Sequence, residues 1–194
     1  GIRRQFVYLY DMNPTWKIRA QKPYTAVAQL SEALKIPHFV AQLLLQRGIE
    51  SREQAQVFFK PQQGTLHDPF LMHNMSAAVA RLSQAITYQE KVLLYGDYDV
   101  DGTTAVALMA EQLAELGLEC SYYIPDRYRE GYGVSAAGID YTIAAGYDLL
   151  ITLDCGIKAH TQLARAHEAQ IDIIVCDHHQ PDSTLPPGII LNPK

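Results

Sequence analysis

Apolar residues gather in short, nearly continuous runs along the second half of the chain, and segments with helical periodicity separate these runs. The runs predict strands within residues 92–95, 118–126, 147–156, 171–179 and 188–194. The helical pattern falls in residues 102–117, 135–146 and 157–170. Strands that alternate with helices are typical of a parallel sheet, and continuous apolar strands are typical of a sheet covered on both faces. We therefore expect an α/β fold whose parallel sheet carries helices on both faces.

The first half of the chain has helical periodicity without strand-like runs. Helices are predicted in residues 25–34, 37–48, 51–59 and 76–89. Ser51 and Gln54 have the spacing of a capping box before the third of these helices. The sequence thus predicts an irregular N-terminal extension (1–24), a small helical segment (25–90) and an α/β domain (91–194).

Composition narrows the class of protein. The chain is 48% hydrophobic, which is enough for a packed core, and no apolar run approaches the ~20 residues of a membrane span. Its three cysteines include no CxxC pair, so we expect reduced thiols in a cytoplasmic protein instead of disulfides or a zinc site. The net charge of −5 argues against holding nucleic acid by bulk charge. A polyanionic substrate would therefore need local positive charge, from metal ions or from segments outside this chain.

Three of the predicted strands end in carboxylates, and one of them adds a pair of histidines. These residues are Asp97, Asp99 and Asp101 after the first strand, Asp154 at the end of the third, and Asp177, His178 and His179 at the end of the fourth. Because the carboxyl ends of parallel strands share one edge of the sheet, these side chains are expected to converge. Carboxylates with imidazole suit Mn²⁺ or Mg²⁺, and there are enough of them for two ions with one bridging aspartate. For the first cluster alone, a solvated acidic turn is the alternative.

Two glycines and two tyrosines are further candidates. Gly102 and Gly156 follow two of these strand ends at predicted helix starts, where backbone N–H groups bind anions. Ordinary tight turns explain both glycines equally well. Tyr128 and Tyr132 lie in a glycine-punctuated loop and are candidates for stacking on nucleic-acid bases.

The segments GDYDVDG, LDCGI and DHH each follow an apolar run, and in this order they resemble the first three motifs of the DHH phosphoesterase superfamily. The segments IPDRYREGYGVS and LPPGIILNPK resemble the corresponding parts of its RecJ-type branch, the single-strand-specific 5′ exonucleases. Together the resemblance covers about residues 25–194. A lone DxD string is a weak signal, whereas the ordered set of motifs is highly specific.

Carried over to matching positions, the resemblance implies a role for each strand-end residue. The implied metal ligands are Asp99, Asp101, His178 and Asp154, with Asp97 as a ligand or a support. Asp154 would bridge two Mn²⁺ or Mg²⁺ ions and take part in catalysis together with His179, which lies nearer the substrate phosphate. Asp177 would orient a histidine from behind the ligands. Arg127 would contact a phosphate through its guanidinium and Gly156 through its backbone.

The implied function is a metal-dependent 5′→3′ exonuclease that hydrolyses single-stranded DNA in recombination and repair, in the cytoplasm, with no membrane contact and no small organic cofactor. Two alternatives stay open. One is a phosphodiesterase or phosphatase acting on oligonucleotides, cyclic dinucleotides or pyrophosphate, although those branches usually carry a histidine ahead of the DxD of the first motif. The other is a non-catalytic replication scaffold, which would have lost its ligands.

The resemblance also implies parts that this chain lacks. The family's fourth motif, its associated C-terminal domain and the oligonucleotide-binding fold of RecJ-type enzymes would follow Lys194. These parts would supply a further metal ligand and much of the grip on single strands. We therefore expect an N-terminal fragment that is poorly active alone.

Overall fold

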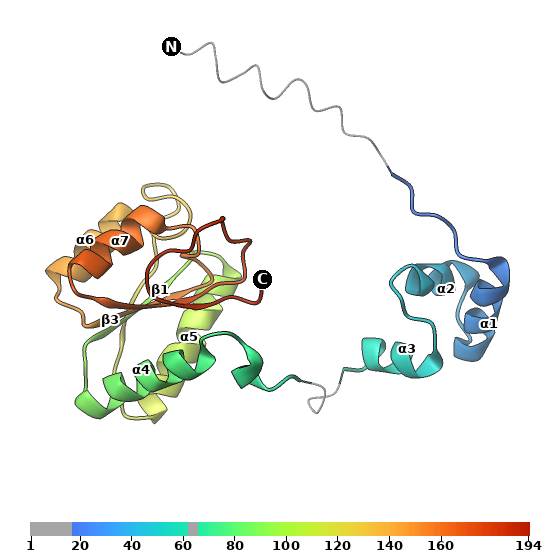
Figure 1. The fold of residues 1–194 in the computed structure, drawn as a ribbon, viewed down its shortest axis with the longest axis horizontal. Helices are drawn as coiled ribbons and strands as arrows, with labels where there is room; N and C mark the ends of the chain where they lie inside the picture. Colours follow the sequence, from blue (N-terminus) through green and yellow to red (C-terminus); the bar gives the residue numbers. More distant parts are fainter. Residues whose placement is uncertain (1–16, 62–65) are drawn as a thin grey trace, which may run out of the picture. The chain divides into compact units, whose positions relative to one another are not determined.

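The computed structural model describes residues 17–61 and 66–194, which fall into two compact units (Figure 1). The first unit ends at Leu66, and the second covers His67–Lys194. The predicted irregular extension lies largely outside the described residues, and its described part includes no strand and no helix before Tyr24. No helix in the described part of the chain is both long and apolar enough to cross a bilayer.

The described part of the first unit contains three helices, as the periodicity predicted. They are α1 (Tyr24–Leu34), α2 (His38–Leu45) and α3 (Arg52–Phe59). Their apolar faces meet in a small core that includes Leu30, Leu44 and Ala55. The predicted capping box is confirmed at the start of α3: Ser51 Oγ accepts from the Gln54 N–H, and Gln54 Oε1 accepts from the Ser51 N–H, each at 3.2 Å.

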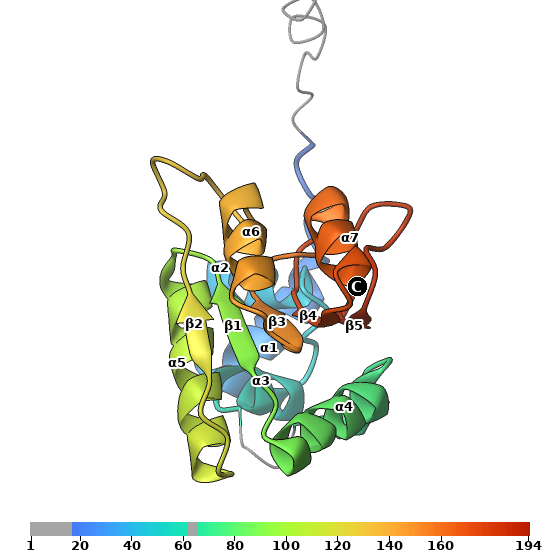
Figure 2. The same ribbon diagram turned by 90° about the vertical axis from the view of Figure 1, so that its left-hand side faces the viewer.

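The second unit, which the structure describes over its whole length, contains a five-stranded parallel sheet in the order β2-β1-β3-β4-β5 (Figure 2). The strands are β1 (Val92–Gly96), β2 (Ser121–Tyr123), β3 (Leu149–Leu153), β4 (Asp172–Cys176) and β5 (Ile189–Leu191). One face carries α4 (Met75–Tyr88), preceded by the short 3₁₀ helix η3 (Pro69–Leu71), and α5 (Val100–Glu115), and the other carries α6 (Ala136–Ala144) and α7 (His160–Glu168) (Figure 1). The predicted fold class is confirmed.

Successive residues of the central strands pack into two separate cores. Leu93 and Tyr95 of β1 belong to the core beneath α6 and α7, whereas Val92 and Leu94 belong to the core beneath α4 and α5. Every residue of β1 and of β3 is buried, which explains why their sequences are continuous apolar runs. Because a one-residue slip would exchange the two sets of side chains, this burial fixes the register of the sheet.

The ends of β1, β3 and β4 are level with one another. Gly96 pairs with Leu153, and Leu153 pairs in turn with Cys176. The residues that follow these three are Asp97, Asp154 and Asp177. Since the strands are parallel, the register sets the three aspartates side by side at the carboxyl edge of the sheet.

Helix α4 belongs to the sheet unit, and this corrects the predicted boundary at residue 90. Ala78 and Ala85 of α4 are buried in the same core as the β1 side chains. Arg81 also bonds Asp172 at the start of β4, with Nε 2.6 Å from Oδ2. Periodicity predicts a helix but not the surface against which it packs, so the compact units divide between Leu66 and His67 instead.

Candidate metal centre

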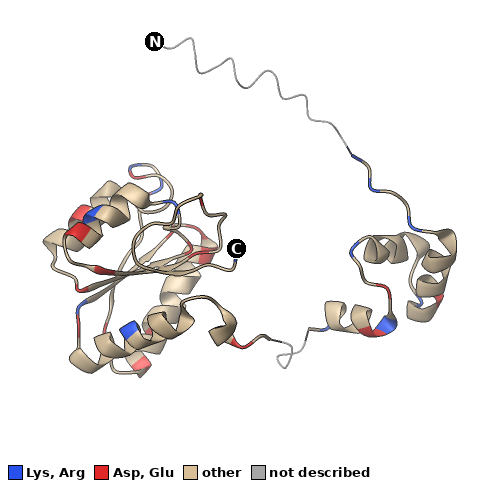
Figure 3. Ribbon diagram, viewed as in Figure 1, with Lys and Arg blue, Asp and Glu red and all other residues tan. Residues whose placement is uncertain are grey.

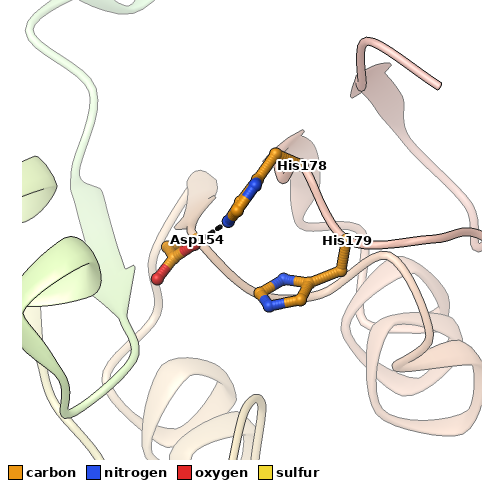
Figure 4. Close-up of side chains that lie close together, drawn as sticks. All are labelled: Asp154, His178 and His179. Carbon is orange, nitrogen blue, oxygen red and sulfur yellow. Dashed lines mark ion pairs between the residues drawn. The ribbon is translucent and has the colours of Figure 1, made fainter. Parts of the chain in front are cut away.

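Asp154, His178 and His179 lie together at the carboxyl edge of the sheet (Figure 4). One nitrogen or oxygen atom from each lies within 4.8 Å of the other two, and His178 Nε2 is 3.0 Å from Asp154 Oδ1. A carboxylate and two imidazoles at this separation suit a divalent cation such as Mn²⁺. The fold thus brings the predicted bridging aspartate to both histidines of the DHH segment.

The turn that carries Asp154 is tight. Asp154 has φ +61°, in the left-handed region that few residues with side chains adopt, and its N–H donates to the Cys176 carbonyl at 2.8 Å. Two residues later Gly156 has φ +108°, and a Cβ at that position would lie 2.6 Å from Thr152 Oγ1. The turn therefore requires glycine, and the hydrogen bond to β4 helps to hold the strained aspartate in place.

The predicted helix start at Gly156 is wrong. Helix α7 begins only at His160, and the Ile157 N–H donates to Asp177 Oδ2 at 3.0 Å. The Asp177 carboxylate thus accepts from an N–H group in the turn after Asp154, where the sequence predicted contact with a substrate anion. The geometry favours the tight-turn explanation of Gly156.

Asp97 is fully buried, and only one of its two carboxylate oxygens accepts a hydrogen bond from the described residues. Its Oδ1 accepts from the Gly133 N–H at 3.2 Å, whereas Oδ2 has no hydrogen-bond partner among the described residues. Burying an unpaired carboxylate oxygen is costly, by about 1–3 kcal/mol or more for a charged group. A cation beside Oδ2 would remove that cost, so Asp97 fits a metal site.

Asp99 and Asp101 lie at the exposed start of α5. Asp99 caps this helix, because its Oδ1 accepts from the N–H groups of Asp101 and Gly102, each at 3.0 Å. The helix start therefore offers these two N–H groups to Asp99 and not to a phosphate. Asp101 reaches the rest of the site: it lines an apolar groove of about 730 Å³ together with Asp154 and His178.

Asp177 holds His179 from behind. Its Oδ1 lies 2.7 Å from His179 Nδ1 and also accepts from the His179 N–H at 3.0 Å. Burial raises the pKa of Asp177, but the hydrogen bonds from Ile157 and His179 outweigh it and lower the pKa. With the proton on Nδ1, His179 Nε2 is an acceptor, and the Tyr132 hydroxyl lies 3.1 Å from it.

The electrostatics of Asp154 also fit a cation. Burial and the neighbouring charge of Asp99 raise the pKa of Asp154, and the two histidines only partly oppose this. The carboxylate is therefore poorly stabilised by the protein alone. A divalent cation at this position would lower the pKa and hold Asp154 ionised.

The other predicted contacts lie in the loop between β2 and α6. Arg127 Cζ lies 4.6 Å from the centre of the Tyr98 ring, and Tyr128 is 93% exposed. Tyr132, predicted as a stacking residue, has its hydroxyl on His179 instead. The sequence missed Tyr98 and Gly133 as parts of this site, and the only signal for Tyr98 was its place between two of the acidic residues.

All three cysteines lie in the described part of the chain and are free. Cys155 follows Asp154 directly, but its side chain is buried, and burial beside Asp177 and Asp97 raises its pKa well above the ordinary value. A buried thiol that resists ionisation is a packing residue and not a nucleophile.

The parallel sheet and the carboxylate and histidine residues at its carboxyl edge lie in the part of the chain that matches a known protein family. A model of the DHH family, N-terminal domain, matches residues 91–194, and the chain belongs to this family.

The curated relatives are single-stranded-DNA-specific exonucleases. The chain is 40% identical to RecJ of Bacillus subtilis over 181 residues, which are 92% of this chain and 23% of that protein. It is 32% identical to RecJ of Thermus thermophilus over 182 residues, 92% of this chain and 25% of the relative. The chain thus spans about a quarter of the length of these relatives.

Solved structures of RecJ are similar as well. A crystal structure of exonuclease RecJ bound to manganese matches with a TM-score of 0.62 and 36% identity over 66% of this chain and 33% of that one. A crystal structure of RecJ from Thermus thermophilus in complex with Mn²⁺ matches with a TM-score of 0.68 and 28% identity over 92% of this chain and 24% of that one.

Proposed function

We propose that this chain supplies most of the metal centre of an exonuclease that hydrolyses single-stranded DNA with two divalent cations, Mn²⁺ or Mg²⁺. The observation that carries the proposal is the meeting of Asp154 with His178 and His179 at level strand ends, together with the unpaired carboxylate oxygen of the buried Asp97 at the neighbouring strand end. The relatives named above act on single-stranded DNA, and solved RecJ structures hold manganese. Both facts support the same class of substrate and cation.

The proposed ligands are Asp97, Asp99, Asp101, Asp154 and His178, with Asp154 as the bridge between the ions. The unpaired Oδ2 of Asp97 fits a metal ligand. The largely buried carboxylate of Asp154 fits one as well. Bound cations of this kind lower the pKa of water and neutralise charge on a phosphate. Asp101 lines the apolar groove together with Asp154 and His178, which fits a ligand role.

The remaining residues handle the substrate. His179 is 43% exposed in its side chain and is fixed by Asp177, so we assign its ring to the substrate phosphate. Arg127 offers a planar guanidinium that can bind a phosphate through two N–H groups. Lys and Arg are scattered along the described ribbons of both units among Asp and Glu (Figure 3). Local contacts such as those of His179 and Arg127, and not a continuous basic surface, would therefore bind the single-stranded DNA.

We further propose 5′→3′ polarity, a role in recombination and repair, and a cytoplasmic location, which suits three free thiols. Because the chain spans about a quarter of its relatives, we expect the isolated 194 residues to be poorly active. The rest of a longer product would supply strand binding.

The test is release of mononucleotides from single strands labelled at the 5′ end, in Mn²⁺, by the isolated chain and by the longest product of its gene. Asp154→Ala should abolish release, and Asp140→Asn serves as a matched control, because that exposed carboxylate of α6 pairs with Arg165 of α7. Activity that survives Asp154→Ala contradicts the mechanism. Hydrolysis only of dinucleotides or pyrophosphate favours the phosphatase alternative, and no hydrolysis at all favours the scaffold.

A further inference from the structure

An unbroken series of contacts joins Arg127 to His179 across the site. The Arg127 guanidinium carbon lies 4.6 Å from the centre of the Tyr98 ring. The Tyr98 and Tyr132 rings meet edge to face, with centroids 6.4 Å apart and an interplanar angle of 83°. The Tyr132 hydroxyl then lies 3.1 Å from His179 Nε2, with the two rings also edge to face at 5.9 Å.

Each contact is of a kind that fixes geometry. A guanidinium over an aromatic face is attracted by the ring quadrupole, and edge-to-face pairs are favoured over face-to-face ones. A long arginine side chain otherwise loses much rotamer entropy when it is immobilised. Stacking on Tyr98 removes part of that loss before a phosphate arrives.

The loop that carries Arg127 and Tyr132 is itself anchored by Glu130. Its carboxylate accepts from the Asp126 N–H at 2.9 Å, the Tyr123 hydroxyl at 2.8 Å and the Ser135 hydroxyl at 2.5 Å. These donors lie at the beginning of the loop, on β2 and at the end of the loop. The loop is therefore held at both ends, and the two tyrosines meet between fixed supports.

We propose that Tyr98 and Tyr132 form a positioning bridge that holds the Arg127 guanidinium and the His179 ring at a set spacing for one substrate phosphate. The inference rests on the proposed function, because it assumes that both residues contact substrate. It gives Tyr98, which stands between Asp97 and Asp99, a task separate from metal binding. It also replaces base stacking as the role of Tyr132.

The contact between Tyr98 and Arg127 can be measured without DNA. In a double-mutant cycle of urea unfolding, Tyr98→Leu and Arg127→Ala should be coupled, so that the unfolding constant of the pair differs about two- to fivefold from additivity. Tyr98→Phe keeps the aromatic face and should retain the coupling. Additive effects, or a Tyr98→Phe variant that behaves like Tyr98→Leu, overturn the bridge.

Kinetics on single-stranded DNA then test its purpose in the longest gene product. Tyr98→Leu should raise KM about two- to fivefold at unchanged kcat, and Tyr98→Phe should restore KM. Tyr132→Phe keeps the ring but loses the hydroxyl, so kcat should fall about two- to tenfold at unchanged KM. The bridge alone is overturned if the wild type hydrolyses DNA but Tyr98 and Arg127 show no coupling in unfolding. It is also overturned if Tyr98→Leu does not act on KM and Tyr132→Phe on kcat as expected. Intact coupling without any hydrolysis overturns the proposed function alone.

Discussion

Replacing Gly102 by alanine should push the start of α5 away from β1. A Cβ on Gly102 would lie 2.4 Å from the Asp97 carbonyl oxygen and 2.5 Å from the Asp97 nitrogen, well below the 3.0 Å that real contacts respect. Both atoms are backbone atoms of a buried segment, so the helix must move by at least about 0.6 Å. Overpacking of this kind costs about 1–3 kcal/mol, and the better helix propensity of alanine returns at most about 1 kcal/mol. We expect a net loss of about 1–2 kcal/mol in the free energy of unfolding.

The same movement carries Asp99 and Asp101 away from Asp154, so Gly102→Ala should also weaken Mn²⁺ binding. Urea unfolding followed by circular dichroism gives the stability, and titration calorimetry gives the Mn²⁺ affinity. Gly117→Ala is the matched control, because Gly117 has φ +83° and none of the described atoms lies near its missing Cβ. It should lose about 1 kcal/mol from backbone strain and keep the Mn²⁺ affinity. Wild-type stability and affinity in Gly102→Ala would refute the close packing, and equal losses of affinity in both variants would refute the link to the metal site.

Three further outcomes are expected. Burial raises the pKa of Glu130, but the hydrogen bonds that its carboxylate accepts outweigh burial and lower the pKa below the usual 4.5. The ionised carboxylate therefore stabilises the fold above pH 4.5, and this stabilisation is lost as the pH falls and the carboxylate is protonated. Glu130→Gln should therefore cost about 1–2 kcal/mol at pH 7, with a smaller difference at pH 3 in urea titrations. Leu163→Ala removes a fully buried side chain and should cost about 2–4 kcal/mol, whereas Leu185→Ala, at a side chain 56% exposed, should change the urea midpoint little. Mn²⁺ at a hundred times its Kd should stabilise the wild type by about 2.7 kcal/mol, and Asp154→Asn should abolish that gain in thermal melts.

The sequence was most informative where burial is complete. Strands β1 and β3 are buried at every residue, and so their apolar runs predicted them closely. The edge strand β2 was predicted across residues 118–126 but spans only Ser121–Tyr123, and Ser121 and Tyr122 are exposed. An edge strand has one neighbour and less need for apolar side chains, which leaves a weak pattern.

The residues of the candidate site also divide into some that the sequence predicted and some that it did not. The convergence of Asp97, Asp154 and Asp177 followed from strand ends and parallel topology, and the sheet register realises it. The contacts of Tyr98 with Arg127 and of Tyr132 with His179 join residues 29 and 47 positions apart. They depend on a loop conformation set by hydrogen bonds such as those of Glu130, and no periodicity encodes such bonds.

The arrangement of hydrogen bonds also indicates how the proposed ligands reach their places. Asp97 uses one oxygen on the Gly133 N–H, and Asp99 uses one on the first N–H groups of α5, which leaves the second oxygen of each for a cation. Asp154 is fixed through its backbone by β4. The fold, and not the ion, therefore orients these carboxylates, in contrast to small domains whose folding free energy comes from the metal. The cost of that order is the unpaired Asp97 oxygen and the raised pKa of Asp154, and binding of divalent cations by both carboxylates, as proposed above, would relieve both.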